Sequence, residues 1–297
     1  NIGVENLGYK VCAEADIEHS GSEQTPIIPI DIYLRIIGIW DGYLQPALKK
    51  KENIKILLKL MKADRAYASS HASQEKYKIR KEDYRQNGQQ AIIENDLADI
   101  FGSVNSGSLF EIKRRNQITS AITRIQFVCK NVIHLYTGMR DQEVDRLRIN
   151  CIDRVQITLD AKDGSTIIDK GDIAELISTT TKFTGYKKEA SWLAPKQVIE
   201  AVTLAKAISE AVYDTLGENL EDKYKLLFVN VSSKGESGLA NFGTETIRSV
   251  NPKIIITRKD MDELMASDPE RNFNTEGKFK IGQPWPLATL CCTAQGF

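Results

Sequence analysis

Arg140 is the residue whose type and position most suggest a chemical role, because it stands at the corner between two predicted helices. The apolar run before it stops at Gly138, and glycine suits the positive φ of a helix C-terminus. The run after it starts with Asp141 and Glu143, acids that the helix dipole favours in a first turn. The same dipole does not favour a cation there. A residue held against local preference in a tight corner is a candidate functional residue.

Basic residues are concentrated in the first part of the chain, although the net charge of the whole chain is zero. The segment from Lys49 to Arg85 contains twelve basic and five acidic residues. Such an excess is what a surface for nucleic acid or another polyanion requires. It is also typical of an ordinary solvated helix surface, so the composition leaves both interpretations open.

The other reactive side chains form no recognisable catalytic or metal site. The five cysteines include no C-x-x-C pair and have no histidine at metal-ligand spacing, so we interpret them as buried, reduced thiols of a cytoplasmic protein. Ser232, Ser233 and Ser237 have no acid and histidine partners nearby, which argues against a serine hydrolase. His134 is predicted near the polar edge of a helix, where a structural or solvated role is typical. No G-x-x-x-x-G-K or G-x-G-x-x-G motif is present, and we predict no cofactor and no metal.

The elements that must position Arg140 are mainly helices, and the predicted fold class is mainly α with a small antiparallel β-sheet (α+β). Helices are predicted from Asp31 (broken or restarted at Pro46), over Asn53–Ala68 and Gln90–Phe101, from Asn116 to Gly138, from Asp141 to near Asn150, from Pro195 to about Leu216, and from Thr257 to Leu264. Strands are predicted over Val155–Asp160, Ile173–Phe183 and Ser191–Leu193.

A Gly/Ser loop, Gly102–Ser108, is the best candidate for a domain boundary. It divides a helical, basic DNA-binding domain, residues 1–108, from a second domain, residues 109–297. No apolar run is long enough to span a membrane and no signal peptide opens the chain, so no membrane partner is predicted. The chain starts at Asn1 without a methionine, which indicates a fragment or a processed form.

Several segments together resemble the tyrosine recombinases, also called phage-type integrases. The run Leu135–Asp153 (LYTGMRDQEVDRLRINCID) resembles the family's first conserved box, in which a T-G-x-R-x-x-E corner follows a helix. Thr181–Gly185 (TKFTG) resembles the family's β-hairpin lysine segment and precedes a helix that starts with proline. Thr25–Pro29 and Pro284–Thr289 resemble segments of the larger integrases of mobile elements. The resemblance covers roughly residues 117–289.

The resemblance implies a DNA strand-exchange chemistry that explains these residue types. In the family a tyrosine attacks a DNA phosphodiester and forms a 3′-phosphotyrosyl link, without metal or nucleotide. By resemblance, Arg140 would bind the non-bridging phosphate oxygens, Glu143 would support it, and Lys182 would protonate the leaving 5′-oxygen. The partners would be double-stranded DNA and other copies of the chain on that DNA, in the integration and recombination of a mobile element.

A clamp of the family type would also bring the basic first domain and the linker residues onto the DNA. Lys113, Arg114 and Arg115 lead into the central helix and are the predicted DNA-binding residues. Substituting the three together should weaken DNA binding and have little effect on the fold.

The sequence departs from the family where the last catalytic box belongs. No histidine follows His134, the last arginine is Arg271 and the last tyrosine is Tyr224, so the H-x-x-R box and the nucleophile are missing. We therefore expect no strand cleavage by this polypeptide alone. A truncated or frame-shifted product and a naturally inactive relative both fit. The alternative function is that of a noncatalytic helical DNA-binding or interaction protein that kept the recombinase scaffold.

Overall fold

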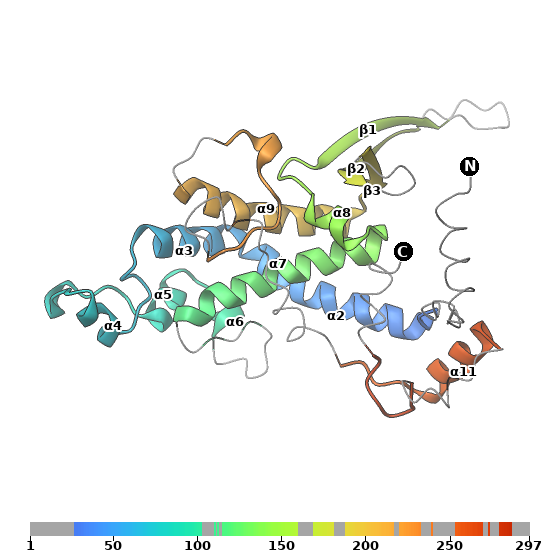
Figure 1. Ribbon diagram of the computed structural model, residues 1–297, viewed down its shortest axis with the longest axis horizontal. Coiled ribbons are helices and arrows are strands. Elements are labelled where there is room, and N and C mark those ends of the chain that lie inside the picture. Colours follow the sequence, from blue (N-terminus) through green and yellow to red (C-terminus); the bar gives the residue numbers. More distant parts are fainter. Residues whose placement is uncertain are drawn as a thin grey trace, which may run out of the picture.

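The structure of the protein is a computed structural model that describes residues 27–102, 110, 112, 115–159, 169–180, 188–216, 220–232, 239, 253–269, 273 and 279–286. For residues 115–116, 155–159 and 169–172 only the backbone is described. Within these ranges the chain is mainly helical with one small antiparallel sheet, which confirms the predicted fold class (Figure 1). No helix among them combines the length and the apolar character that crossing a bilayer requires.

Four long helices form the body of the protein. The described α-helices are α2 (Ile30–Lys49), α3 (Lys51–Ala63), α4 (His71–Lys76), α5 (Gly88–Glu94), α6 (Ala98–Phe101), α7 (Arg115–Thr137), α8 (Asp141–Asp145), α9 (Lys196–Leu216) and α11 (Arg258–Ser267), with short 3₁₀ turns η1 (Lys81–Asp83) and η2 (Asp222–Tyr224). The central helix α7 packs against α2, α8 and α9, and α3 packs against α9. Its apolar residues Ile122, Ile125 and Ile133 are fully buried, and Tyr136, nearer the helix end, is partly buried.

A single hydrophobic cluster runs through α2, α3, α7 and α9. Trp40 of α2, for example, contacts the ring of Phe127 of α7 with 6.2 Å between the ring centroids. Helices from before and after the Gly/Ser loop therefore share one core. The division into domains 1–108 and 109–297 stays a prediction.

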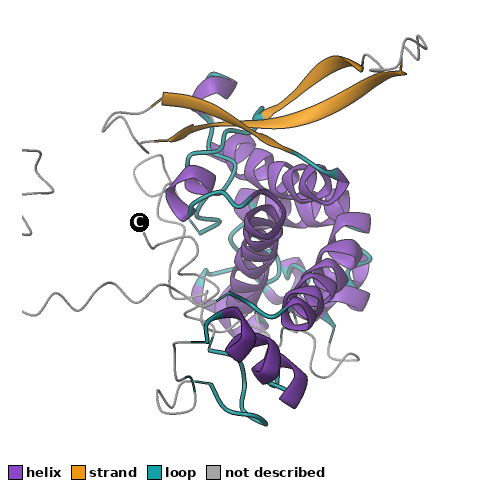
Figure 2. Ribbon diagram, turned by 90° about the vertical axis from the view of Figure 1, so that its right-hand side faces the viewer, coloured by secondary structure: helices purple, strands orange, loops and turns teal. Residues whose placement is uncertain are grey.

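The sheet lies along one side of the helices and is attached to them at one end (Figure 2). Its strands β1 (Ile152–Leu159), β2 (Asp169–Thr180) and β3 (Lys188–Leu193) pair antiparallel in the order β1-β2-β3. Leu176 of β2 is fully buried, and β3 has alternating exposed and half-buried positions. The three strands predicted from the sequence are thus present, each starting a few residues earlier than expected. Strand β2 is described as far as Thr180, and its predicted end at Phe183 lies outside the described residues.

The second helix of the corner, α8, is much shorter than predicted. It ends at Asp145, and the following backbone bonds to a distant segment. The N–H of Ile149 donates to the carbonyl of Lys225 at 3.2 Å, and the N–H of Leu227 donates to the carbonyl of Leu147 at 2.9 Å. These tertiary backbone bonds replace the helical ones, so the prediction of a helix to Asn150 was wrong.

Three other helix predictions also need correction. The helix predicted over Asn53–Ala68 ends at Ala63, and the backbone of Asp64 is extended. Pro46 does not break α2. It lies near the helix end, and it removes the hydrogen bond to the carbonyl of Gly42, four residues earlier. Both residues are exposed to solvent. The predicted helix Gln90–Phe101 is divided into α5 and α6. Asp96, between them, has a φ of 53°, which no helix residue can adopt.

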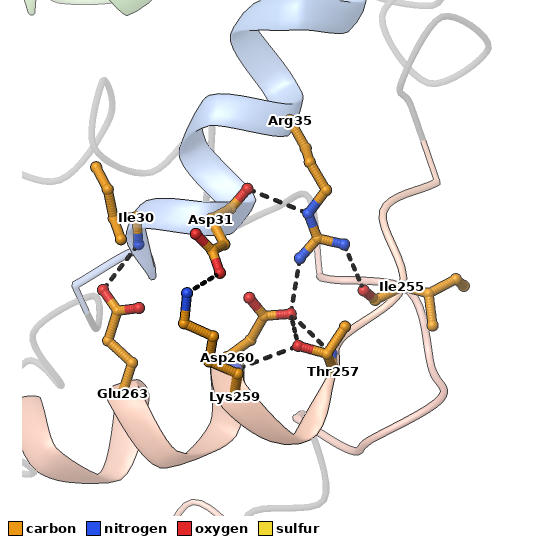
Figure 3. A network of polar contacts seen from close by, with 8 residues as sticks. All are labelled: Ile30, Asp31, Arg35, Ile255, Thr257, Lys259, Asp260 and Glu263. Carbon is orange, nitrogen blue, oxygen red and sulfur yellow. Dashed lines mark hydrogen bonds and ion pairs between the residues drawn. The ribbon is translucent and has the colours of Figure 1, made fainter.

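Helix α11 is joined to the start of α2 by an ion pair in which the carboxylate of Asp260 is buried and Arg35 is partly exposed (Figure 3). Arg35 donates to the carbonyl oxygen of Ile255 at 3.0 Å and pairs with Oδ2 of Asp260 at 2.7 Å. The same carboxylate accepts 2.7 Å hydrogen bonds from the N–H and the hydroxyl of Thr257, which caps α11 as predicted. Burial acts to raise the pKa of Asp260, but the bonds from Thr257 and the ion pair with Arg35 outweigh it and lower that pKa.

Exposed contacts complete this junction on its solvent side. Lys259 pairs with Asp31 at 2.5 Å, and Glu263 accepts a 2.8 Å hydrogen bond from the N–H of Ile30 (Figure 3). Glu263 thereby satisfies one of the backbone donors that the first turn of α2 leaves without a helical partner.

Candidate functional site

The corner between α7 and α8 is a short turn closed by local hydrogen bonds. The first helix ends at Thr137 and the second begins at Asp141. Gly138 has a φ of 65°, and its N–H donates to the carbonyl of His134 at 3.0 Å, which confirms the predicted glycine cap. The hydroxyl oxygen of Thr137 accepts a 3.2 Å hydrogen bond from the N–H of Met139. The backbone that leads into Arg140 is therefore fixed.

The peptide group that joins Met139 to Arg140 is held at both of its polar atoms. Its carbonyl oxygen lies 2.8 Å from Nδ1 of His134, and because a carbonyl can only accept, the ring nitrogen donates. Its N–H donates to Oε2 of Glu143 at 2.7 Å. His134 belongs to α7 and Glu143 to α8. Since the two polar atoms of a trans peptide point in opposite directions, the two helices grip this peptide from opposite sides.

Glu143 also ties α8 to the end of β2. Its side chain is buried, and its Oε1 accepts a 2.6 Å hydrogen bond from the hydroxyl of Thr180. Its backbone carbonyl accepts another 2.6 Å bond, from the hydroxyl of Ser178. Glu143 therefore contacts the backbone of Arg140 and the strand, and it makes no hydrogen bond or ion pair with the Arg140 guanidinium.

The β2–β3 turn that carries Lys182 starts from this contact. Thr180 is the last residue of β2, and its register partner Lys188 is the first residue of β3. Residues 181–187, Lys182 among them, lie outside the described residues. The described part of β2 thus ends beside α8.

Two of the six predicted site residues can be located completely. The structure brings Arg140 and Glu143 together at the corner. Lys113 and Arg114 lie outside the described residues, and of Arg115 only the backbone is described, at the start of α7. Their predicted contact with DNA stays a prediction.

The guanidinium of Arg140 is half-buried and makes no hydrogen bond or ion pair with any part of the chain that the structure describes. The neighbouring arginines differ in this respect. Arg146 donates to the carbonyl of Thr179 at 3.3 Å, and Arg148 donates to the carbonyl of Tyr224 at 2.8 Å. Among these three arginines, Arg140 is thus the one whose side-chain donors are not used by the described residues.

The acids beside Arg140 are paired with cations of α7. Lys130 is buried, and its Nζ lies 2.8 Å from Asp141 and 2.6 Å from Asp145. Nε2 of His134 lies 3.4 Å from Oδ1 of Asp141. The hydrogen bond with His134, and next those with Lys130, hold the pKa of the Asp141 carboxyl well below its usual range, although burial acts in the opposite direction. Neither acid is therefore left to neutralise Arg140.

Part of the basic excess in the first half of the chain is used inside the protein. Lys55 and Lys59 of α3 pair with Glu210 and Asp214 of α9, each at 2.6 Å, and Lys50 pairs with Asp96. These lysines help to fix α3 on α9. The exposed face of α3 is therefore less available to a polyanion than its sequence indicated.

Free lysines are instead found on an ordered loop, residues 69–87, which contains α4 and η1. Gln74, fully buried, donates to the carbonyls of Ser69 and Arg85 at 3.1 and 2.8 Å and accepts from the N–H of Arg85 at 2.7 Å. Three lysines of this loop are exposed and form no ion pair with the described residues. They are Lys76, Lys78 and Lys81.

The two cysteines among the described residues are free and buried, as interpreted from the sequence. Burial raises the pKa of the Cys151 thiol to about 12, and burial also raises the pKa of Cys129. Neither thiol is activated as a nucleophile or a ligand. No group of three or more metal-ligating side chains occurs in the described part of the chain.

No family model, curated protein or solved structure matches this chain. The site therefore rests on its own geometry. Sequence reasoning gave His134 a structural or solvated role without a partner and missed Ser178 and Thr180, because these contacts depend on the meeting of α7, α8 and β2. For His134 the available signal was its position one turn before the Gly138 cap.

Proposed function

We propose that this protein binds double-stranded DNA through a tyrosine-recombinase-type scaffold, with Arg140 on a backbone phosphate. The observation that carries the proposal is the guanidinium of Arg140, which has no partner among the described residues and stands on a backbone that His134 and Glu143 hold fixed. Its planar fork of donors matches the oxygens of a phosphate, and the fixed backbone reduces the freedom that Arg140 loses on binding. Asp141 and Asp145 are paired with Lys130, so no described acid neutralises Arg140.

The same geometry supports a role for Arg140 in strand exchange within a complete recombinase. Charge grows on the non-bridging oxygens when a phosphodiester is attacked, and a preorganised arginine stabilises that charge. Lys182 follows Thr180 by two residues, so the covalent chain keeps the Cα atoms of these two residues within about 7 Å. Thr180 bonds Glu143, and Glu143 bonds the backbone of Arg140, so the residue at which β2 ends is anchored at the proposed phosphate site.

A second contact with DNA is proposed at the 69–87 loop. Its lysines at positions 76, 78 and 81 are exposed, and Gln74 gives the loop a defined shape. These lysines pair with no described residue and stand on a loop of defined shape. They can therefore bind the phosphates of DNA, and this binding is favoured by the release of counterions from the DNA. Figure 1 shows α4 at the far end of the helical body from α8, so this contact would be remote from Arg140.

The test is the binding of duplex DNA by Arg140→Ala, measured by fluorescence anisotropy over a range of salt concentrations. We expect an affinity loss of about tenfold and a salt slope smaller by about 0.9, as for one lost phosphate contact. Arg258→Ala is the matched control, because Arg258 is an exposed arginine at the start of α11. Equal affinities and equal slopes for the two variants would overturn the proposal.

The alternative function, a noncatalytic DNA-binding or interaction protein on the same scaffold, is favoured by one observation. The given sequence holds no histidine after His134 and no tyrosine after Tyr224, the residue types of the family's last catalytic segment. A DNA-binding protein of either kind would use Arg140 to contact DNA. They differ in whether a covalent link to the DNA forms.

A further inference from the structure

We propose that His134 is a positioning residue for Arg140, acting through the single peptide group that joins Met139 to Arg140. The inference rests on the proposed function, because positioning matters only if Arg140 binds a phosphate. His134 does not touch the guanidinium. Its hydrogen bond of 2.8 Å to the carbonyl of Met139 fixes the plane from which the Cα of Arg140 departs.

The corner needs such a bond because its neighbour is a glycine. Gly138 has a φ of 65° and no Cβ, and no atom lies within 4 Å of the place where a Cβ would be. Glycine leaves the backbone free to rotate at this point. The bonds of Thr137 and His134 to the two sides of Met139 remove that freedom. Of the two, the bond of His134 is the one made to the peptide of Arg140 itself.

The ring of His134 is oriented by charged groups on both helices. Its Nε2 lies 3.4 Å from Asp141, and Asp141 and Asp145 share the buried Lys130. The protonated ring donates to both Met139 and Asp141. The neutral ring keeps its proton on Nδ1, because the carbonyl of Met139 is the closer partner and can only accept a hydrogen bond. The bond to Met139 therefore persists in both charge states.

Both ring nitrogens face acceptors of the protein, Nδ1 the carbonyl of Met139 and Nε2 the carboxylate of Asp141, and neither is directed towards a ligand. Its side chain is 18% exposed. These observations assign it a supporting place behind Arg140 and separate it from the groups that would contact DNA.

The experiment compares His134→Asn, His134→Gln and His134→Ala in the whole chain. The shorter asparagine amide can place a donor near the position of Nδ1, whereas the glutamine amide reaches towards the position of Nε2 and Asp141. Binding of a duplex DNA is measured by anisotropy, and thermal unfolding checks that each variant is folded. We expect a loss of about fivefold for the alanine and glutamine variants and recovery to within about twofold for asparagine.

The same substitutions are then made together with Arg140→Ala to form a double-mutant cycle. If His134 acts through Arg140, the alanine substitution at position 134 costs no further affinity once Arg140 is gone. Additive losses, or an asparagine variant as weak as the alanine variant, would overturn the inference alone. If Arg140→Ala binds DNA like the unchanged protein, the proposed function fails and the inference fails with it.

Discussion

The hydroxyl group of Thr180 donates a 2.6 Å hydrogen bond to the carboxylate of Glu143, and this bond joins the last residue of β2 to the first turn of α8. The other carboxylate oxygen of Glu143 accepts the N–H of Arg140. One buried side chain thus couples the hairpin to the corner. A displacement of β2 would be transmitted to the backbone of Arg140 through two hydrogen bonds.

Removing the Glu143 carboxylate should destabilise the protein more than its size suggests. In Glu143→Ala the N–H of Arg140 and the hydroxyl of Thr180 both lose a buried acceptor, and we expect a loss of about 2–3 kcal/mol in the free energy of unfolding. Glu143→Gln should cost less than about 1.5 kcal/mol, because the Thr180 hydroxyl can reverse and accept from the amide. Urea unfolding measures both. An alanine variant as stable as the glutamine variant would contradict the coupling.

Asp141 should make the protein sensitive to acid. Its pKa is lowered in the folded state, so near pH 4 the unfolded chain binds more protons, and the stability that Asp141 contributes is lost as the pH falls. Asp141→Asn should therefore be less stable than the unchanged protein at neutral pH, with a difference that shrinks below about pH 4. Urea midpoints at a series of pH values measure it. The control is Asp262→Asn, at an exposed position of α11. Its difference in stability from the unchanged protein should not vary with pH, and a constant difference for Asp141→Asn would contradict the prediction.

The sequence predicted local features of the fold better than tertiary ones. The end of α7 at Gly138 and the start of α11 at Thr257 follow from one residue's backbone or capping chemistry, and both are confirmed. The end of α8 depends on backbone bonds between residues 147–149 and 225–227, which are far apart in the sequence. The same limit applies to the lysines of α3, whose acidic partners lie on α9 and could not be assigned from local charge.

Part of the candidate site was visible in the sequence for the same reason. Arg140 stood out because a cation at a helix start violates a local preference. The part played by His134 could not be predicted, since its neighbour Met139 gives no signal in the spacing of residues. The sequence thus identifies a residue that violates a local preference, such as Arg140, whereas the structure is needed to identify a residue that fixes its backbone, such as His134.

The junction between α2 and α11 should depend on the ion pair of the buried Asp260 far more than on the exposed pair of Lys259. The side chain of Asp260 is fully buried, so Asp260→Asn weakens its bonds with Arg35 and Thr257 and should cost about 2 kcal/mol. Lys259→Met removes an exposed pair with Asp31 and should leave the free energy of unfolding almost unchanged. In hydrogen-exchange measurements, the backbone amides of α11 should exchange faster in Asp260→Asn than in the unchanged protein, and at an unchanged rate in Lys259→Met. Equal losses for the two variants would contradict this order.

A nicked suicide substrate should not become covalently linked to this polypeptide. The family's nucleophile follows its last catalytic box, and here the last tyrosine is Tyr224, upstream of that place. Denaturing gels should show unmodified protein and DNA, whereas native gels should show the complex, which proves that the substrate was bound. A covalent adduct would instead favour an active recombinase over the noncatalytic alternative.

Replacing the three free lysines of the 69–87 loop should weaken DNA binding through electrostatics alone. The variant Lys76→Gln, Lys78→Gln, Lys81→Gln removes charges that pair with no described residue, so the fold should be unaffected. If each lysine neutralises a phosphate, the slope of log affinity against log salt should fall by up to about 2.7. The matched control, Lys253→Gln with Lys280→Gln, removes exposed lysines near α11.

Duplex length separates a contact by this loop from a general effect of net charge. The helix α7 is 23 residues long, or about 35 Å at 1.5 Å per residue, and it runs between the end of the body that carries α4 and the corner at α8 (Figure 1). DNA rises 3.4 Å per base pair, so the two proposed contacts would be about ten base pairs apart. The triple variant should therefore bind a long duplex more weakly but bind a duplex of about eight base pairs almost normally, because that duplex cannot reach both contacts. An equal loss on both duplexes would show that the loop acts only through overall charge.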